Sequence, residues 1–164
     1  MRRDELDLEF VWLPIPEDEF DVGELMNEPL VAVLPMGHRL ADKPTVASKD
    51  LSSEPLVLLS RALAPDSFHQ IEELFVRAGA VMNVAHELEN LMSMINFVAM
   101  GTGCGVVPDH TRAIRRKGVV YRPLRAPNLI RRLAIIKKKG HGDLAELFYR
   151  FTIENLARLR GFGQ

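Results

Sequence analysis

The segment MGTGCGVVPDH, residues 100–110, combines residue types whose spacing could support chemistry. Three glycines in five positions could form a phosphate-binding loop, and the segment holds the chain's single cysteine, Cys104. A dinucleotide-binding loop follows a strand and precedes a helix, whereas here a helical pattern precedes Gly101 and the apolar run GVVP comes after the glycines. A Walker-type loop also needs Lys and Ser or Thr after its last glycine, and this segment has neither there. We therefore interpret the run as a helix end, with Gly101 in a left-handed turn, that leads into a buried strand.

Cys104 and the histidines are the other candidates for nucleophilic or metal chemistry. Cys104 stands beside apolar Val106 and Val107, so we expect a buried, unreactive thiol, for which His110 is only a nominal base. The five histidines are His38, His69, His86, His110 and His141. No two of them have the H-x-x-x-H spacing of a helical metal site, and one cysteine cannot form a disulfide or a C-x-x-C cluster. The sequence thus predicts no catalytic residue, no metal and no cofactor, and favours a protein that is not an enzyme.

The composition is that of a soluble globular protein with one domain or two small lobes. The chain has 164 residues, 47% of them hydrophobic and 26% charged, with a net charge of −1. This balance indicates neither a nucleic-acid-binding protein nor an acidic tail. No apolar run approaches the roughly 18 residues of a membrane span, and the N-terminus does not have the pattern of a signal peptide. With a single cysteine, we expect a cytoplasmic protein.

Apolar runs and helical periodicity alternate along most of the chain, which predicts an α/β fold with largely parallel sheets. The predicted strands are residues 6–13, 29–35, 55–60, 81–88, 103–108, 118–124 and 130–140. The predicted helices are residues 48–51, 64–80, 89–101, 109–118 and 142–161. Ser67 and Gln70 have the spacing of a capping box, and the prolines and acids of residues 14–25 predict an exposed loop. The alternation suggests a two-lobed clamp, with residues 1–44 and 118–164 in lobe 1 and residues 45–117 in lobe 2.

Five segments follow one another along the chain: LDLEFV, EPLVAVLPMGHRLA, LSSEPLVLLSR, INFVAMGTGCGVVPDH and GVVYRPL. Together and in this order, they resemble the effector-binding domain of LysR-type transcriptional regulators. Arg39 stands where proline is common in that family, and the usual glycine before the first strand is replaced around Asp4 and Glu5. The resemblance implies a periplasmic-binding-protein-like fold of two α/β lobes joined by two crossover strands. It also implies that a small metabolite binds between the lobes and changes transcription through a DNA-bound tetramer.

Compared with that family, the chain lacks the winged helix-turn-helix, the linker helix and the opening strand–helix–strand–helix segment of lobe 1. We therefore expect an N-terminally truncated domain with an incomplete lobe 1 and an apolar edge near residues 6–12. DNA would be bound only through a helix-turn-helix outside this chain. The expected partners are a small-molecule effector, for which a carboxylate is a candidate, and further copies of the chain, but no membrane. Two functions stay open, an effector-sensing regulatory domain and an interaction or dimerisation fragment without a competent ligand site.

The candidate ligand-binding residues lie where predicted strands end and helices begin. They are Trp12, Ser60, Arg61, Pro65, Ser67, Phe68, Leu91, Met92 and Pro108. Free amides at the start of a helix suit an anion, and Arg61 could pair with a carboxylate or remain a solvated surface residue. Ser67 could contact ligand or cap the helix, and Trp12 could stack on a ring or serve packing alone. The resemblance places Leu91, Met92 and Pro108 at the cleft, although the pattern alone assigns Leu91 to the core.

Overall fold

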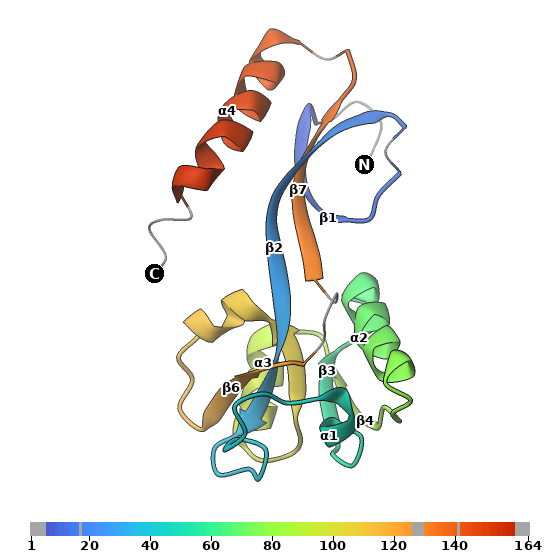
Figure 1. Ribbon diagram of the computed structural model, residues 1–164, viewed down its shortest axis with the longest axis vertical. Helices are drawn as coiled ribbons and strands as arrows, with labels where there is room; N and C mark the ends of the chain where they lie inside the picture. The colour runs from blue at the N-terminus through green and yellow to red at the C-terminus, as the bar shows by residue number, and fades with distance from the viewer. Residues whose placement is uncertain (1–5, 17, 126–129, 141, 160–164) are drawn as a thin grey trace. The chain divides into compact units, whose positions relative to one another are not determined.

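The computed structural model of the protein describes residues 6–16, 18–125, 130–140 and 142–159. Its contacts divide the chain into two compact units, unit 1 (Met1–Glu28 with Arg131–Gln164) and unit 2 (Pro29–Ile130). Their helices and strands confirm the predicted α/β class (Figure 1). The predicted lobes, residues 1–44 with 118–164 and residues 45–117, stay a prediction. One long strand, β2 (Phe20–Pro35), continues from unit 1 into unit 2. None of the helices within the described ranges is both long and apolar enough to span a membrane.

Unit 1 consists of strands joined in one sheet and a long helix. Strand β1 (Leu8–Leu13) pairs antiparallel with β7 (Ile130–Lys138), and β7 lies between β1 and β2. Helix α4 (Asp143–Leu159) contacts β2 at Gly23, where an added Cβ atom would overlap the end of the Ile153 side chain. The lack of a side chain at Gly23 therefore allows the helix to approach the strand.

The predicted loop at residues 14–25 is wrong from Phe20 onward, because β2 begins there. The acidic residues that suggested a loop are instead matched by basic residues of β7. Glu24 forms an ion pair with Arg132 at 2.6 Å, and Asp21 forms one with Lys137 at 2.9 Å. Opposite charges on neighbouring strands stabilise a sheet, so an acidic segment can be a strand when its partner is basic.

Unit 2 contains the second half of β2 and eight further elements. These are α1 (Ser48–Leu51), β3 (Leu56–Leu59), α2 (Pro65–Arg77), β4 (Val84–Leu88), α3 (Leu91–Ala99), β5 (Gly105–Pro108), the 3-10 helix η1 (Asp109–Ala113) and β6 (Val119–Pro123). The elements confirm the predicted order of strands and helices in this part of the chain. Gly101, just after α3, has a φ of 82°, which confirms the left-handed turn predicted for the glycine run.

The prediction of largely parallel sheets is wrong for the strands that the structure describes. Strands β3 and β4 are parallel, but the β1–β7, β2–β5 and β2–β6 ladders are antiparallel. A parallel bridge between Leu56 and Cys104 places the start of β5 beside β3, on the side away from β4. The sheet of unit 2 thus combines a parallel strand–helix–strand core with the antiparallel passage of β2, which alternation of elements cannot reveal.

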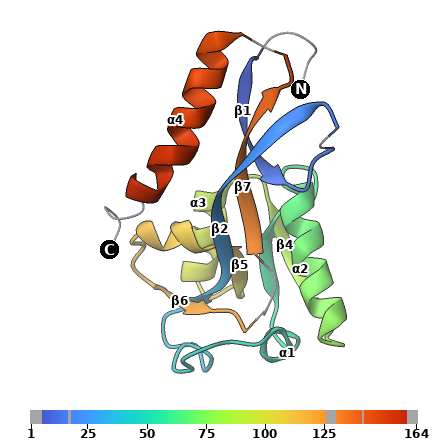
Figure 2. The same cartoon turned by 45° about the horizontal axis from the view of Figure 1, so that its top comes forward.

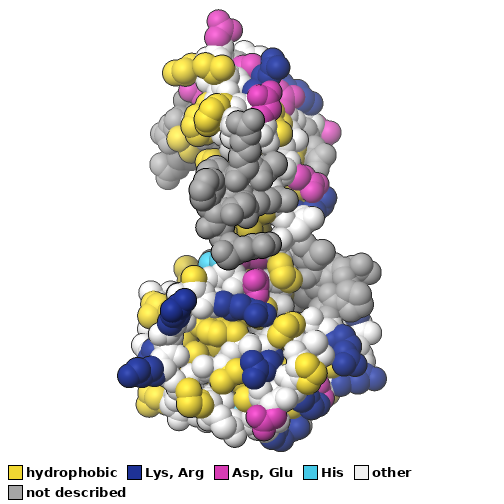
Figure 3. Space-filling model, turned by 60° about the vertical axis from the view of Figure 1, so that its left-hand side comes forward, with side chains coloured by type: hydrophobic (Ala, Val, Ile, Leu, Met, Phe, Trp, Pro, Cys, Tyr) yellow, Lys and Arg dark blue, Asp and Glu magenta, His cyan; other side chains and the backbone are white. Residues whose placement is uncertain are grey.

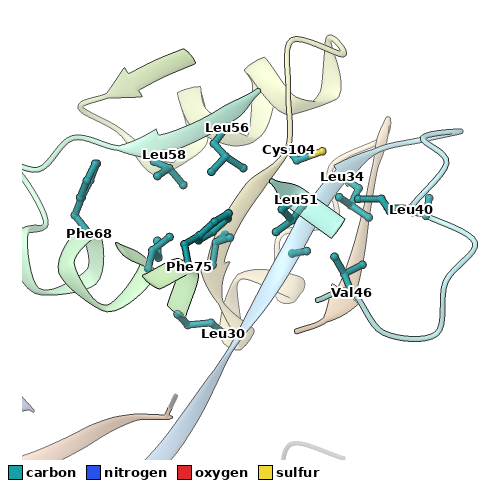
Figure 4. Packing of buried hydrophobic residues seen from close by; sticks show 14 residues of the cluster. Leu30, Leu34, Leu40, Val46, Leu51, Leu56, Leu58, Phe68, Phe75 and Cys104 are labelled. Atoms are coloured by element: carbon teal, nitrogen blue, oxygen red, sulfur yellow. The ribbon is translucent and has the colours of Figure 1, made fainter. Parts of the chain in front are cut away.

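Side chains of β2 alternate between two apolar clusters, one on each face of the sheet. Leu30, Ala32 and Leu34 pack with α2 residues such as Phe75, whereas Val31 and Val33 pack with α3 residues such as Ile95. Figures 1 and 2 show α2 and α3 on opposite sides of the strands, and Figure 4 shows the first cluster, which includes Cys104. Burial on both faces explains why the run PLVAVLP is continuously apolar.

Candidate functional site

The carboxyl ends of β3, β4 and the strand β5 form one edge of unit 2. Strand β3 lies between β4 and β5, and α2 and α3 leave this edge toward opposite faces of the sheet. In open α/β sheets, ligands bind outside the carboxyl ends of the strands, at the point where the strand order reverses and the following helices go to opposite faces. The residues predicted from the sequence that lie at this edge are Ser60, Arg61, Pro65, Ser67, Phe68, Leu91, Met92 and Pro108.

Ser60 fixes the turn between β3 and α2. Its amide donates a hydrogen bond of 2.9 Å to the carbonyl of Leu88, which joins the ends of β3 and β4. Its hydroxyl oxygen accepts one of 3.2 Å from the Leu63 amide, and its carbonyl accepts one of 3.0 Å from the Ala64 amide. The side chain is buried and its hydroxyl oxygen is used by the turn, so Ser60 shapes the start of α2.

Helix α2 begins at Pro65, so the predicted capping box of Ser67 and Gln70 is wrong. The N-cap is Ala64, whose side chain offers no hydrogen bond, and Ser67 is the third residue of the helix. Proline fixes its own φ near the helical value and needs no amide partner, which favours a start at Pro65. Among the hydrogen bonds of the described residues, none is donated by the backbone amides of Asp66 and Ser67. These amides and the positive end of the helix dipole favour an anion, whereas the carboxylate of Asp66, in the same first turn, opposes one.

Arg61 is paired with acidic side chains at this edge. Its guanidinium donates hydrogen bonds of 2.5 and 3.1 Å to the two carboxylate oxygens of Glu72, and its backbone amide donates one of 3.0 Å to Glu87. The hydrogen bond to Glu72 raises the pKa of the Arg61 guanidinium above its ordinary value. The guanidinium carbon lies 4.3 Å from the centroid of the Phe68 ring, which is itself buried. Glu72 and Glu87 were not predicted from the sequence, because their roles depend on tertiary contacts with Arg61.

The other predicted residues of unit 2 border the same strand ends. Leu91 is half-buried and packs against the apolar cluster below α3, as its pattern indicates, whereas Met92 is exposed. Asn90 caps α3, because its Oδ1 accepts hydrogen bonds of 2.8 and 3.2 Å from the amides of Met92 and Ser93. Pro108 ends β5 opposite Leu30 of β2 and is half-buried.

The predicted ligand contact Trp12 belongs to unit 1. It lies on β1 opposite Leu133 of β7, and the guanidinium of Arg131 stacks over its ring at 4.0 Å. Both faces of an aromatic ring can bind a cation or a second ring, so the contact with Arg131 occupies one face. The structure therefore brings Ser60, Arg61 and Phe68 together in unit 2, whereas Trp12 belongs to unit 1.

Cys104 is buried, as predicted from its apolar neighbours. Burial is the main cause that raises the pKa of the Cys104 thiol to about 12, and the negative charge of Glu54 adds to the rise. The thiol is therefore protonated and unreactive at neutral pH. The imidazole beside it is that of His38, at 3.8 Å from Nε2 to Sγ, so the sequence-based suggestion of His110 as a base is corrected.

Comparison with known proteins assigns this architecture to a family. Residues 1–157 match the model of the LysR substrate binding domain. Among curated relatives, the chain is 30% identical over 128 residues to the Hca operon transcriptional activator HcaR of Escherichia coli (strain K12), which covers 76% of this chain and 42% of HcaR. It is 33% identical over 103 residues to the HTH-type transcriptional regulator TtuA of Agrobacterium vitis, covering 63% of this chain and 34% of TtuA. The chain thus spans less than half the length of these two relatives.

Solved structures agree with this assignment at the level of the fold. The BenM effector binding domain with its effector benzoate has a TM-score of 0.80 and 22% identity, with 97% of this chain and 72% of that chain covered. CbnR, a LysR family transcriptional regulator, has a TM-score of 0.78 and 16% identity, with 93% of this chain and 53% of that chain covered. The fold is therefore the periplasmic-binding-protein-like fold of such effector-binding domains, as the resemblance implied. The chain belongs to the LysR substrate-binding domain family.

Proposed function

We propose that the chain is the effector-sensing domain of a LysR-type transcriptional regulator, which binds a small metabolite and thereby controls transcription. The family match over residues 1–157 carries this proposal. In the whole regulator, a helix-turn-helix would bind DNA, and copies of the chain would assemble into an oligomer. A regulator of transcription acts where the DNA is, which supports the predicted cytoplasmic location. The curated relatives are transcriptional regulators, which supports a role without catalysis.

We further propose that the effector is a small organic anion with a carboxylate. The carboxylate would accept hydrogen bonds from Arg61 and from the free amides of Asp66 and Ser67, beside the ring of Phe68. Benzoate, the effector named for BenM, is an aromatic carboxylate and is the first compound to test. Of the other residues predicted from the sequence, Ser60, Pro65, Leu91, Met92 and Pro108 belong to unit 2 with Arg61, and Trp12, in unit 1, stays a prediction. Glu72 would have to release Arg61 at least in part, since it now occupies the guanidinium.

A thermal-shift screen tests this proposal. Carboxylates, including benzoate, are compared at saturating concentration with neutral amides of the same shape, such as benzamide. A carboxylate effector should raise Tm by about 2–8 °C, while its amide should not. Arg61→Gln should abolish the shift, whereas Arg77→Gln, which removes another Arg–Glu pair of α2, should preserve it. A folded protein that no member of the screen stabilises would contradict the proposal.

The interaction-fragment alternative has one supporting observation, the exposed apolar face of α4. Leu144, Leu147, Phe148 and Phe151 are 79%, 66%, 48% and 61% exposed. Figure 3 shows hydrophobic side chains exposed on the part of the molecule that carries α4. Such faces mark interaction sites, and a second copy of the chain is the partner we propose. Light scattering over a range of concentrations tests this, since a strict monomer at every concentration would contradict it.

A further inference from the structure

Three side chains with different ligand atoms converge in unit 2, away from the edge described above. His38 lies in the turn after β2, Glu54 precedes β3, and Cys104 precedes β5. His38 Nε2 lies 3.3 Å from Glu54 Oε2 and 3.8 Å from Cys104 Sγ. The nitrogen, the sulfur and a carboxylate oxygen all lie within 4.8 Å of one another. The thiol and the carboxylate both contact the same nitrogen of the imidazole. In a catalytic Cys–His–carboxylate triad they would contact different ring nitrogens, so this group is not such a triad.

The separations are close to those of ligands that share one metal ion. With Zn–S bonds of about 2.3 Å and Zn–N and Zn–O bonds of about 2.0–2.1 Å, a tetrahedral site has edges of about 3.6 Å between sulfur and nitrogen. The edge between nitrogen and oxygen is then about 3.3 Å. The observed nitrogen-to-sulfur distance of 3.8 Å and nitrogen-to-oxygen distance of 3.3 Å are close to these two edges, and the sulfur-to-oxygen distance is within 4.8 Å.

The surroundings of the three side chains would let an ion reach them from solvent and would hold the carboxylate of Glu54 in place. Cys104 is buried, but the side chains of His38 and Glu54 are 20% and 14% exposed, which gives an ion access from solvent. Arg39 donates hydrogen bonds of 2.9 and 2.5 Å to Glu54 Oε1, which leaves Oε2 directed at His38. Metal-binding carboxylates are commonly held by such outer hydrogen bonds.

We propose that His38, Glu54 and Cys104 bind a divalent metal ion of borderline softness, of which Zn²⁺ is the representative. A thiolate, an imidazole and one carboxylate suit Zn²⁺ or Co²⁺, whereas Mg²⁺ and Ca²⁺ prefer oxygen ligands alone. Burial keeps the metal-free Cys104 thiol protonated, so binding must remove this proton to solvent, and the ion offsets that cost by stabilising the thiolate. Thiolate and carboxylate together offset the charge of the ion. The fourth position is left for water. The site joins three segments of the unit 2 core, so the ion should stabilise the fold.

The ring proton of His38 sets a cost for binding. Nδ1 accepts a 3.3 Å hydrogen bond from the Leu40 amide, which places the proton of the neutral ring on Nε2. An ion at Nε2 requires that proton on Nδ1, so the hydrogen bond from Leu40 is lost. The bond is long, and its loss subtracts from the affinity without preventing coordination.

Cobalt titration of the full 164-residue chain, freed of metal by a chelator, tests the site directly. Because Cys104 is the single cysteine, a thiolate-to-cobalt charge-transfer absorption can come from no other residue. We expect this absorption to saturate at one ion per chain, together with the intense visible bands of a tetrahedral ion. Zn²⁺ should displace the cobalt and raise Tm. These signals do not involve an effector, so their failure would leave the proposed function unaffected.

Variants separate this site from adventitious binding. Cys104→Ser and His38→Gln should remove the charge-transfer absorption and the rise in Tm caused by Zn²⁺, with folding checked by circular dichroism. His69→Gln, which removes a histidine side chain that is 76% exposed, should change neither signal. Arg39→Gln should weaken binding by about 10- to 100-fold, because Glu54 loses its outer hydrogen bonds. Absence of the absorption in the folded wild-type chain, or Zn²⁺ stabilisation that persists in Cys104→Ser, would overturn the proposal.

Discussion

Arg61, in the turn before α2, and Glu72, within α2, form a two-bond ion pair with donor–acceptor distances of 2.5 and 3.1 Å. Glu72 thus occupies the guanidinium of Arg61, which is the cation that we propose for effector binding. Glu72→Gln should therefore raise the affinity for a carboxylate effector, by about two- to fivefold, because an exposed ion pair is weak and its removal frees the guanidinium. Glu73→Gln, which frees Arg77 instead, is the matched control. Unchanged or weaker binding by Glu72→Gln in equilibrium titrations would show that Glu72 does not compete with the effector.

Phe75 anchors the contact of α2 with the sheet. Its side chain is 1% exposed, whereas the next residue, Val76, is 75% exposed. Phe75→Ala should lower the free energy of unfolding by about 3–5 kcal/mol through lost burial and a cavity, and Val76→Ala should change it by less than about 0.5 kcal/mol. Urea denaturation measures both values. Similar effects of the two substitutions would refute the packing of α2 described here.

Asn90 begins α3 through two side-chain hydrogen bonds to backbone amides. Asn90→Ala should lower the free energy of unfolding by about 1 kcal/mol, since two amides lose their acceptor. Asn90→Asp should keep most of that stability, because a carboxylate accepts the same bonds. A loss as large in Asn90→Asp as in Asn90→Ala, measured by urea denaturation, would argue against a capping role.

Lys137 links β7 to β2 and α4, with its Nζ 2.9 Å from Asp21 and 3.0 Å from Glu146. The hydrogen bond to Asp21, and after it the one to Glu146, raises the pKa of Lys137 above its ordinary value. A raised pKa means that the ammonium stabilises the folded state fully below the unfolded value of 10.5, and that this contribution is lost as the pH rises through the folded value.

Lys137→Met should therefore be less stable than the wild type near neutral pH, and the difference should shrink as the pH rises beyond about 10.5. Urea midpoints measured across this range provide the test. Lys139→Met is the control, because Lys139 is exposed and its Nζ donates to the Asp18 carbonyl. A stability difference between wild type and Lys137→Met that stays constant into alkaline pH would contradict this assignment.

Much of unit 2 could be predicted because its signals are local. The period of Phe68, Ile71 and Phe75 indicates α2, and the continuous apolar run near Val31 indicates a strand buried on both faces. The start of α2 was misplaced because the capping-box spacing at Ser67 was given more weight than Pro65. In that case a fixed proline φ determines the first helical residue, and no side-chain cap is needed.

Other features depend on residues far apart in the sequence, and no local pattern carries them. Strand β2 begins among acidic residues because Arg132 and Lys137 face them from a strand more than a hundred positions away. The approach of Cys104 to His38, which are 66 positions apart, likewise follows from the packed sheet. Arg61 could be predicted as a candidate from its residue type and its position after a strand. Its partner Glu72 could not be predicted in the same way.

Calorimetric titration of the best-stabilising carboxylate into the metal-free chain tests the central claim, effector sensing, most directly. The account predicts one ligand per chain, an affinity at least about tenfold weaker in Arg61→Gln, and an unchanged affinity in Arg77→Gln. It also predicts that the neutral amide analogue of the same ligand does not bind. Equal binding of carboxylate and amide, or an affinity unaffected by Arg61→Gln in a folded protein, would contradict the account.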